Sequence, residues 1–178
     1  MNQKDLVALI RTNLLAGLER YGASGIPVKQ AYQPTTQGRV DACVYFWLVS
    51  DTPEGSQYRD QVTDPATLQL TTRETQNIAS TFQLGALIPE DPTNDAQLTA
   101  KDITIMCRQI VQSQPFLAAM TARNIGVRRP SDIREPAFVN EQSQFEYRPS
   151  FDFTVTHKQS IMQLTDSITS VEFNLHRV

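Results

Sequence analysis

Seven apolar residues stand in a row at Cys43–Val49, and this run constrains the fold more than any other feature of the chain. Its β-branched and aromatic residues favour a strand, and a strand without polar alternation is typically covered on both faces. A helix can cover one face and a neighbouring subunit the other. We expect its aromatic residues, Tyr45, Phe46 and Trp47, to enter the core, although the same residues also suit an interface.

Three amphipathic or capped segments predict helices. Apolar residues spaced four apart, from Leu6 to Leu18, indicate a helix over residues 4–21, and Gly22 and Gly25 follow at its expected end. Farther along, Thr99 and Asp102 have approximately the spacing of a capping box in front of a second apolar stripe. Pro115 suits the first turn of a third, short helix at 116–123.

The segments between and after the helices have strand patterns. From residue 67 to 87 every second residue is apolar on one face, while the other face is small and polar. We expect a projecting β-hairpin arm here, preceded by a loop or hairpin tip at 50–65. Alternation from Phe145 to Val155, a turn at 157–159 and a further run to Leu175 predict a closing hairpin.

These elements predict an α+β domain. Its mainly antiparallel β-sheet packs against an N-terminal helix and a central helix pair, with the arm projecting from it. Residues 1–178 form one domain, with the loop and arm at 51–87 as an excursion.

Composition argues against several functional classes. The net charge is −3, without the basic surplus of a protein that grips nucleic acid. No apolar stretch is long enough for a membrane span and the start does not resemble a signal peptide, so we expect a reducing cytoplasm. Cys43 and Cys107 lie in apolar patterns, which indicates two buried free thiols; a single disulfide has no support in the sequence.

The search for catalytic, cofactor and metal sites gives no candidate. His157 and His176 have no Cys, Asp or Glu at metal-ligand spacing, and we expect both to be surface residues at strand ends. Neither a serine nucleophile motif nor a glycine-rich phosphate loop is present. Burial would raise the pKa of both cysteine thiols and leave them inert. We therefore expect no enzyme, no cofactor and no metal.

The order of these segments resembles the tail-terminator, or neck-terminator, family of tailed bacteriophages. The resemblance rests on a short strand with Ala31-Tyr32-Gln33-Pro34, the strand Val44-Tyr45-Phe46, an arm from Glu74 to Leu84, the helix pair, and a closing pair of strands from Phe145 to Phe173. These motifs are structural and extend over nearly the whole chain. Family members carry no catalytic residues, and none is transferred here.

The resemblance implies a virion protein of the tail or neck, assembled in the bacterial host cytoplasm. It implies a homo-oligomeric ring, expected to be a hexamer, that caps the tail-tube protein and ends tail polymerisation. The same ring would bind the head–tail connector or stopper protein, and the tail sheath if the tail is contractile. DNA would pass through the lumen without specific binding, and no membrane is involved.

A closed ring needs two different complementary patches on each subunit. We place them on the sheet and on the arm, and predict these interface residues: Tyr58, Leu68, Leu70, Ile78, Phe82, Leu84, Arg128 and Arg129. The two arginines equally suit a solvated surface. Two alternatives remain open: another ring-forming phage protein, such as a tail-tube subunit or a head–tail stopper, and a small cytosolic ligand-binding domain or enzyme.

Overall fold

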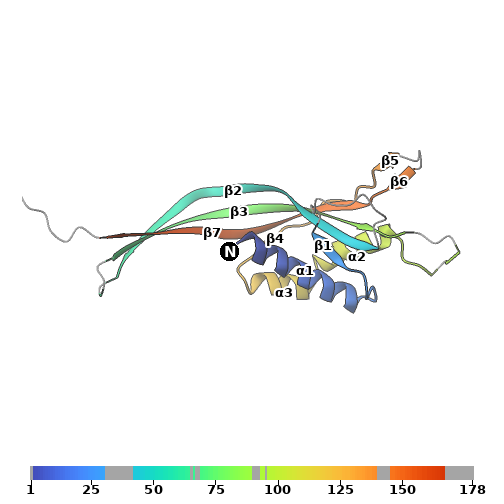
Figure 1. The fold of residues 1–178 in the computed structure, drawn as a ribbon, viewed down its shortest axis with the longest axis horizontal. Coiled ribbons are helices and arrows are strands. Elements are labelled where there is room, and N and C mark those ends of the chain that lie inside the picture. Colours follow the sequence, from blue (N-terminus) through green and yellow to red (C-terminus); the bar gives the residue numbers. More distant parts are fainter. Residues whose placement is uncertain are drawn as a thin grey trace, which may run out of the picture.

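The computed structural model describes residues 2–30, 42–64, 66, 69–89, 93–94, 96–139 and 145–166. Long strands run the length of an extended molecule, and the helices are gathered at one half of it (Figure 1). The elements in chain order are α1 (Gln3–Arg20), β1 (Val28–Gln30), β2 (Cys43–Thr63), β3 (Gln69–Leu87), α2 (Ala100–Ile110), α3 (Gln114–Thr121), β4 (Gly126–Val127), β5 (Ala137–Val139), β6 (Phe145–Tyr147) and β7 (Ser150–Asp166).

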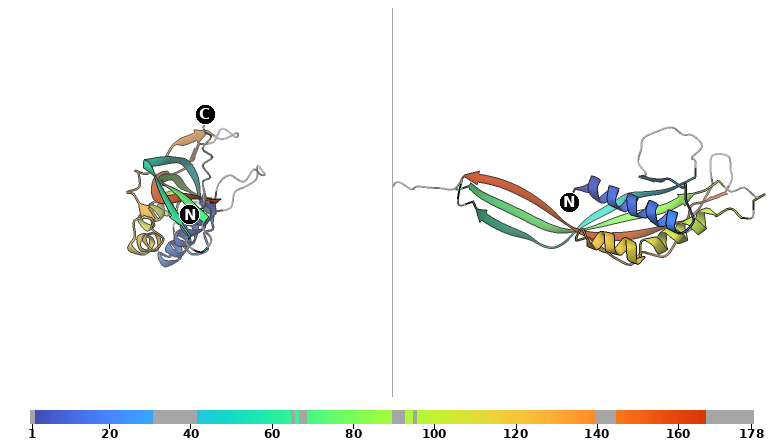
Figure 2. Two further views of the ribbon diagram at one scale, coloured as in Figure 1. Left: turned by 90° about the vertical axis from the view of Figure 1, so that its left-hand side faces the viewer. Right: turned by 90° about the horizontal axis from the view of Figure 1, so that it is seen from below.

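A five-stranded sheet in the order β1-β2-β3-β7-β4 forms the framework. The β1–β2 pair is parallel and the other pairs are antiparallel. The three helices pack on one face of this sheet (Figures 1 and 2). Between them lies a core in which Phe46, Phe82 and Phe153 form successive ring contacts. The predicted α+β class with a mainly antiparallel sheet and three helices is confirmed.

Helix α1 has the ends and the face that the sequence predicts. Asn2 caps its first turn by accepting a hydrogen bond from the Asp5 N–H. At the other end Gly22 adopts a positive φ of 88°, and the Ala23 N–H donates to the Leu18 carbonyl, as in a Schellman motif. The stripe is buried: Leu6, Val7, Ile10, Leu14 and Leu18 all face the core.

The helix pair is also confirmed. Thr99 and Asp102 form the capping box at the start of α2, with side chain and backbone bonded in both directions. Ile103, Cys107 and Ile110 turn into the core. Pro115 lies in the first turn of α3, as predicted, where the missing N–H has no cost.

Two predicted breaks in the strands are wrong. The segment expected as a loop at 50–65 is strand as far as Thr63, because it pairs with β3 along almost its whole length. The turn expected at 157–159 is continuous strand, because β7 pairs with β3 from Ser150 to Asp166. The arm therefore has three strands where a two-stranded hairpin was expected. The predicted strand from Ile168 to Leu175 lies outside the described residues.

An extra residue in β2 explains why the alternation could not be read past the apolar run. Leu48 is opposite Phe82 and Ser50 is opposite Thr81, so Val49 has no partner across the pair. Such a bulge exchanges the faces of the strand. Before it, Phe46 and Leu48 face the helices; after it, Asp51 takes that side.

Candidate assembly surface

The three-stranded arm extends beyond the helices (Figures 1 and 2). It consists of the outer parts of β2, β3 and β7, from about Pro53, Ile78 and His157 to the strand ends. The described pairings leave both of its edges uncovered, since β1 reaches β2 only at 44–46 and β4 reaches β7 only at 155–156. Open strand edges are places where another chain can add.

One face of the arm carries large apolar side chains. Strand register places Val62 and Leu164 on either side of Thr71, Met162 beside Arg73, and Tyr58 beside Thr75, all on the same face. Tyr58, Val62, Met162 and Leu164 are 63%, 59%, 67% and 67% exposed. We call these four residues the arm face. A surface of this kind marks a contact site for another protein.

Polar pairs hold the arm together. On the face opposite the arm face, Glu74 pairs with Arg59 at 2.6 Å and accepts a hydrogen bond from Gln57. Across the arm face itself, Arg73 and Asp60 pair at 2.9 Å. Exposed ion pairs each contribute little, but here they link neighbouring strands and fix their register.

The sheet face turned away from the helices offers a second, different surface. Tyr45 and Trp47 project from it with their rings stacked at 5.6 Å, and both are half-buried. Tyr45 lies over Gly85, where a Cβ would come within 2.7 Å of its hydroxyl oxygen. Burial raises the pKa of Tyr45. The double cover predicted for this strand is therefore half realised within the chain, by the helices on the Phe46 side.

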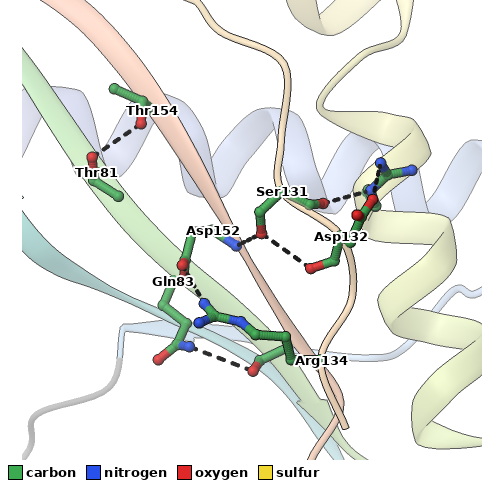
Figure 3. Close-up of polar contacts among 9 residues, drawn as sticks. Thr81, Gln83, Ser131, Asp132, Arg134, Asp152 and Thr154 are labelled. Carbon is green, nitrogen blue, oxygen red and sulfur yellow. Dashed lines mark hydrogen bonds and ion pairs between the residues drawn. The ribbon is translucent and has the colours of Figure 1, made fainter.

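A network of polar contacts continues this outer face (Figure 3). Thr81 and Thr154 share a hydrogen bond of 3.0 Å, and Arg134 pairs with Asp152. Ser131 accepts from the Asp152 N–H at 2.9 Å. The segment that includes Ser131 and Arg134 thus runs along β7 and fixes the outer face as a rigid surface.

The predicted interface residues divide into several groups. Tyr58 is exposed on the arm face, and Leu70, on the opposite side, is half-buried. Phe82 and Leu84 are fully buried in the chain's own core, so their assignment to an interface is wrong. Both lie on the face that the helices cover, which alternation alone did not distinguish from an open face.

The remaining predicted residues lie at the root of the arm or outside the description. Ile78 is half-buried and lines a cavity there. Arg128 pairs with Glu54 of the same chain, and Arg129 is exposed. Leu68 lies outside the described residues. The structure thus brings Arg128 to the root of the arm but does not join it to the arm face.

A buried polar cluster was missed by the sequence reasoning. His157, expected at the surface, is only 9% exposed because β7 continues through it. The Ser80 hydroxyl lies between Asp51, at 2.5 Å, and His157 Nε2, at 3.0 Å. These residues are far apart in the sequence, and no local motif announces them.

This cluster is not arranged for nucleophilic catalysis. A serine nucleophile needs its histidine as base and the carboxylate on the far side of that histidine. Here the serine itself is bonded to the carboxylate. Cys43 and Cys107 are buried thiols without a disulfide, and burial raises the pKa of Cys107 to about 12. Within the described residues no group of three or more metal-ligating side chains comes together.

Among the described helices, none combines the length and the apolar character that crossing a membrane requires. The comparisons with known proteins place the fold and the family. Similarity extends to the sheath/tube terminator of PVC, an extracellular contractile injection system, solved in its extended state. With 14% identity and a TM-score of 0.55, this likeness shows the fold; it covers 97% of the present chain but only 64% of that terminator.

A search of curated proteins finds no match. The model of the family described as E217 gateway protein gp29 matches residues 5–167. Because this match spans nearly the whole described chain, the protein belongs to the E217 gateway protein gp29 family, and its predicted class, a phage tail-terminator or head–tail gateway protein of the virion, is confirmed.

Proposed function

We propose that the protein forms a hexameric ring that caps the tail tube, ends tail polymerisation and joins the tail to the head connector. If the tail is contractile, the ring also contacts the sheath. The observation that carries this proposal is the arm: a three-stranded extension with open edges and an apolar face that the described part of the chain leaves uncovered.

The arm face supplies a driving force for assembly. Full burial of a Val, Leu or Met side chain is worth about 1.5–3 kcal/mol. The four residues of the arm face are roughly two-thirds exposed, so covering them contributes on the order of 4–8 kcal/mol per contact, before the cost of association. A ring closes through as many contacts as it has subunits, which makes such a contribution sufficient for a stable assembly.

The second patch that a ring requires lies, in this proposal, on the outer sheet face around Tyr45 and Trp47. That surface is half-buried and aromatic, and aromatic residues are favoured at protein interfaces. The arm of one subunit would cover the stacked rings of the next. Contact between unlike patches repeats around an axis and closes into a ring.

The ring acts through contact and shape, without catalysis. The buried thiols and the arrangement of Asp51, Ser80 and His157 offer no activated nucleophile. DNA passes through the lumen without specific binding, which the net charge of −3 supports, since a strongly basic lumen would hold the phosphates.

Substitutions on the arm face test the proposal. The variant Val62→Thr/Leu164→Thr keeps β-branched residues in the strands but removes apolar surface. We expect wild-type protein to elute as a ring in light scattering and this variant as a folded monomer. Val49→Thr, an equally exposed residue of β2 outside the arm, is the matched control and leaves the ring intact. An unchanged ring in the double variant contradicts the arm as the contact.

The capping role has its own test. Added to polymerising tail-tube protein from the same virion, wild-type rings should shorten the tubes seen by electron microscopy, each with a ring at one end. The double variant should leave tube length unchanged. Long stacks of this protein alone would instead indicate a tube subunit.

A further inference from the structure

A cavity of about 120 Å³ lies at the root of the arm, between the start of α1 and the sheet. Its wall is half apolar, with Leu6, Ile78 and Phe82, and half polar, with Asp51, Ser80 and His157. Phe82 and Leu6 are buried, whereas Asp51 is exposed, so the cavity opens to solvent on its acidic side. The polar cluster of the previous section therefore faces an accessible space.

The hydrogen bonds of this cluster fix its protons. The Asp51 carboxylate can only accept, so at 2.5 Å the single hydroxyl proton of Ser80 is donated to Asp51. Ser80 must then accept from His157, whose Nε2 carries the ring proton. The other ring nitrogen, Nδ1, is left as an acceptor. It is buried and finds no hydrogen-bond donor among the described residues.

An acceptor left without a donor in a buried place is costly, by about 1–3 kcal/mol. Histidine Nδ1 and the Asp51 carboxylate both line the same cavity, and both accept hydrogen bonds. The site therefore lacks a donor, and the exposed carboxylate favours a cationic one. Its apolar walls favour an alkyl chain behind that donor.

We propose that this cavity binds a primary ammonium group on a short alkyl stem, supplied in the assembly by a lysine side chain of an adjacent subunit. The ammonium donates to Nδ1 of His157 and to Asp51, and its methylenes lie against Leu6 and Phe82. The volume is of the right order, since a cavity of about 150 Å³ accepts a benzene molecule. The source of the lysine rests on the proposed ring; the chemistry of the site does not.

The full-length monomeric variant Val62→Thr/Leu164→Thr, titrated with n-butylammonium, tests the chemistry without the ring. The chain has two histidines, so the imidazole nitrogen signals of His157 can be assigned by NMR with a His157→Gln variant. Binding of a donor at Nδ1 shifts that nitrogen's signal. We expect a saturable shift with n-butylammonium at pH 7 and none with pentanoate, which has a similar stem but an acceptor head.

Matched carboxylate variants locate the charge. Asp51→Asn should weaken n-butylammonium binding by about tenfold, the effect of losing one charged hydrogen-bond partner. Asp132→Asn removes the same charge from a fully exposed side chain and should leave binding unchanged. No saturable shift at Nδ1, an equal response to pentanoate, or equal effects of the two variants overturns the site, and water alone as the occupant gives the first of these results.

The source of the ammonium is tested on wild-type protein in the ring. If an adjacent lysine fills the cavity, the Nδ1 signal is already shifted there and n-butylammonium has no further effect. Continued binding of n-butylammonium in the ring contradicts the lysine source. Failure of the ring itself is seen separately by light scattering, so the two proposals fail independently.

Discussion

Phe82→Ala and Tyr58→Ala separate folding from assembly. Phe82 is fully buried and its ring contacts Phe46 at 6.1 Å and Phe153 at 5.6 Å, between centroids. Replacing a buried Phe by Ala costs about 3–5 kcal/mol, from lost burial and the cavity left behind. Tyr58 is 63% exposed, and such surface substitutions usually change stability by less than about 0.5 kcal/mol.

Thermal and urea unfolding measure the difference, best in the monomeric Val62→Thr/Leu164→Thr background, where assembly adds nothing to stability. We expect Phe82→Ala to lower Tm by roughly 6–20 °C and Tyr58→Ala to leave it nearly unchanged. In the otherwise wild-type chain Tyr58→Ala should weaken the ring in light scattering. Similar destabilisation by both substitutions, or an unweakened ring with Tyr58→Ala, refutes the division into core and arm face.

Three further predictions concern single sites. Gly17→Ala should lower the free energy of unfolding in spite of a helix-propensity gain of about 1 kcal/mol, because the new Cβ would come within 2.5 Å of Ile110; Ile110→Ala in the same chain should show favourable coupling in a double-mutant cycle. Burial raises the pKa of Cys107 to about 12, so its thiol should resist a thiol-specific reagent at pH 8 until urea unfolds the chain. Burial lowers the pKa of His157 below its usual 6.5, so the unfolded chain binds the proton more readily: stability is full above about pH 6.5 and declines as pH falls through the folded-state pKa, a slope that His157→Gln should reduce in urea titrations.

The helices and the core could be predicted because their signals are local. The stripe from Leu6 to Leu18 has the period of a helix, and Gly22 ends it by a backbone conformation that few other residues adopt. Thr99 and Asp102 form their capping box within four residues. Each of these features needs only its own neighbours in the sequence.

The arm needed information that the sequence does not contain locally. Residues 50–63 are polar and include Pro53 and Gly55, which is typical of a loop, yet pairing with β3 holds them as strand. Gly55 has a positive φ of 69° within an irregular part of β2, so its turn-like character is real but absorbed by the strand. Long-range pairing overrode local propensity here.

The buried cluster is beyond local reasoning for the same reason. Asp51 faces the helices only because the bulge at Val49 exchanges the faces of β2, and His157 joins it only because β7 runs on through the expected turn. The arm face depends on the same register, which pairs strands distant in sequence. Alternation showed which residues share a face, but not what covers that face.

Native mass spectrometry of the full-length protein tests the central claim most directly. The account predicts a dominant species with six times the mass of one chain, and mainly single chains for Val62→Thr/Leu164→Thr under the same conditions. A wild-type protein that stays a single chain, or a hexamer that persists when the arm face is changed, would contradict it.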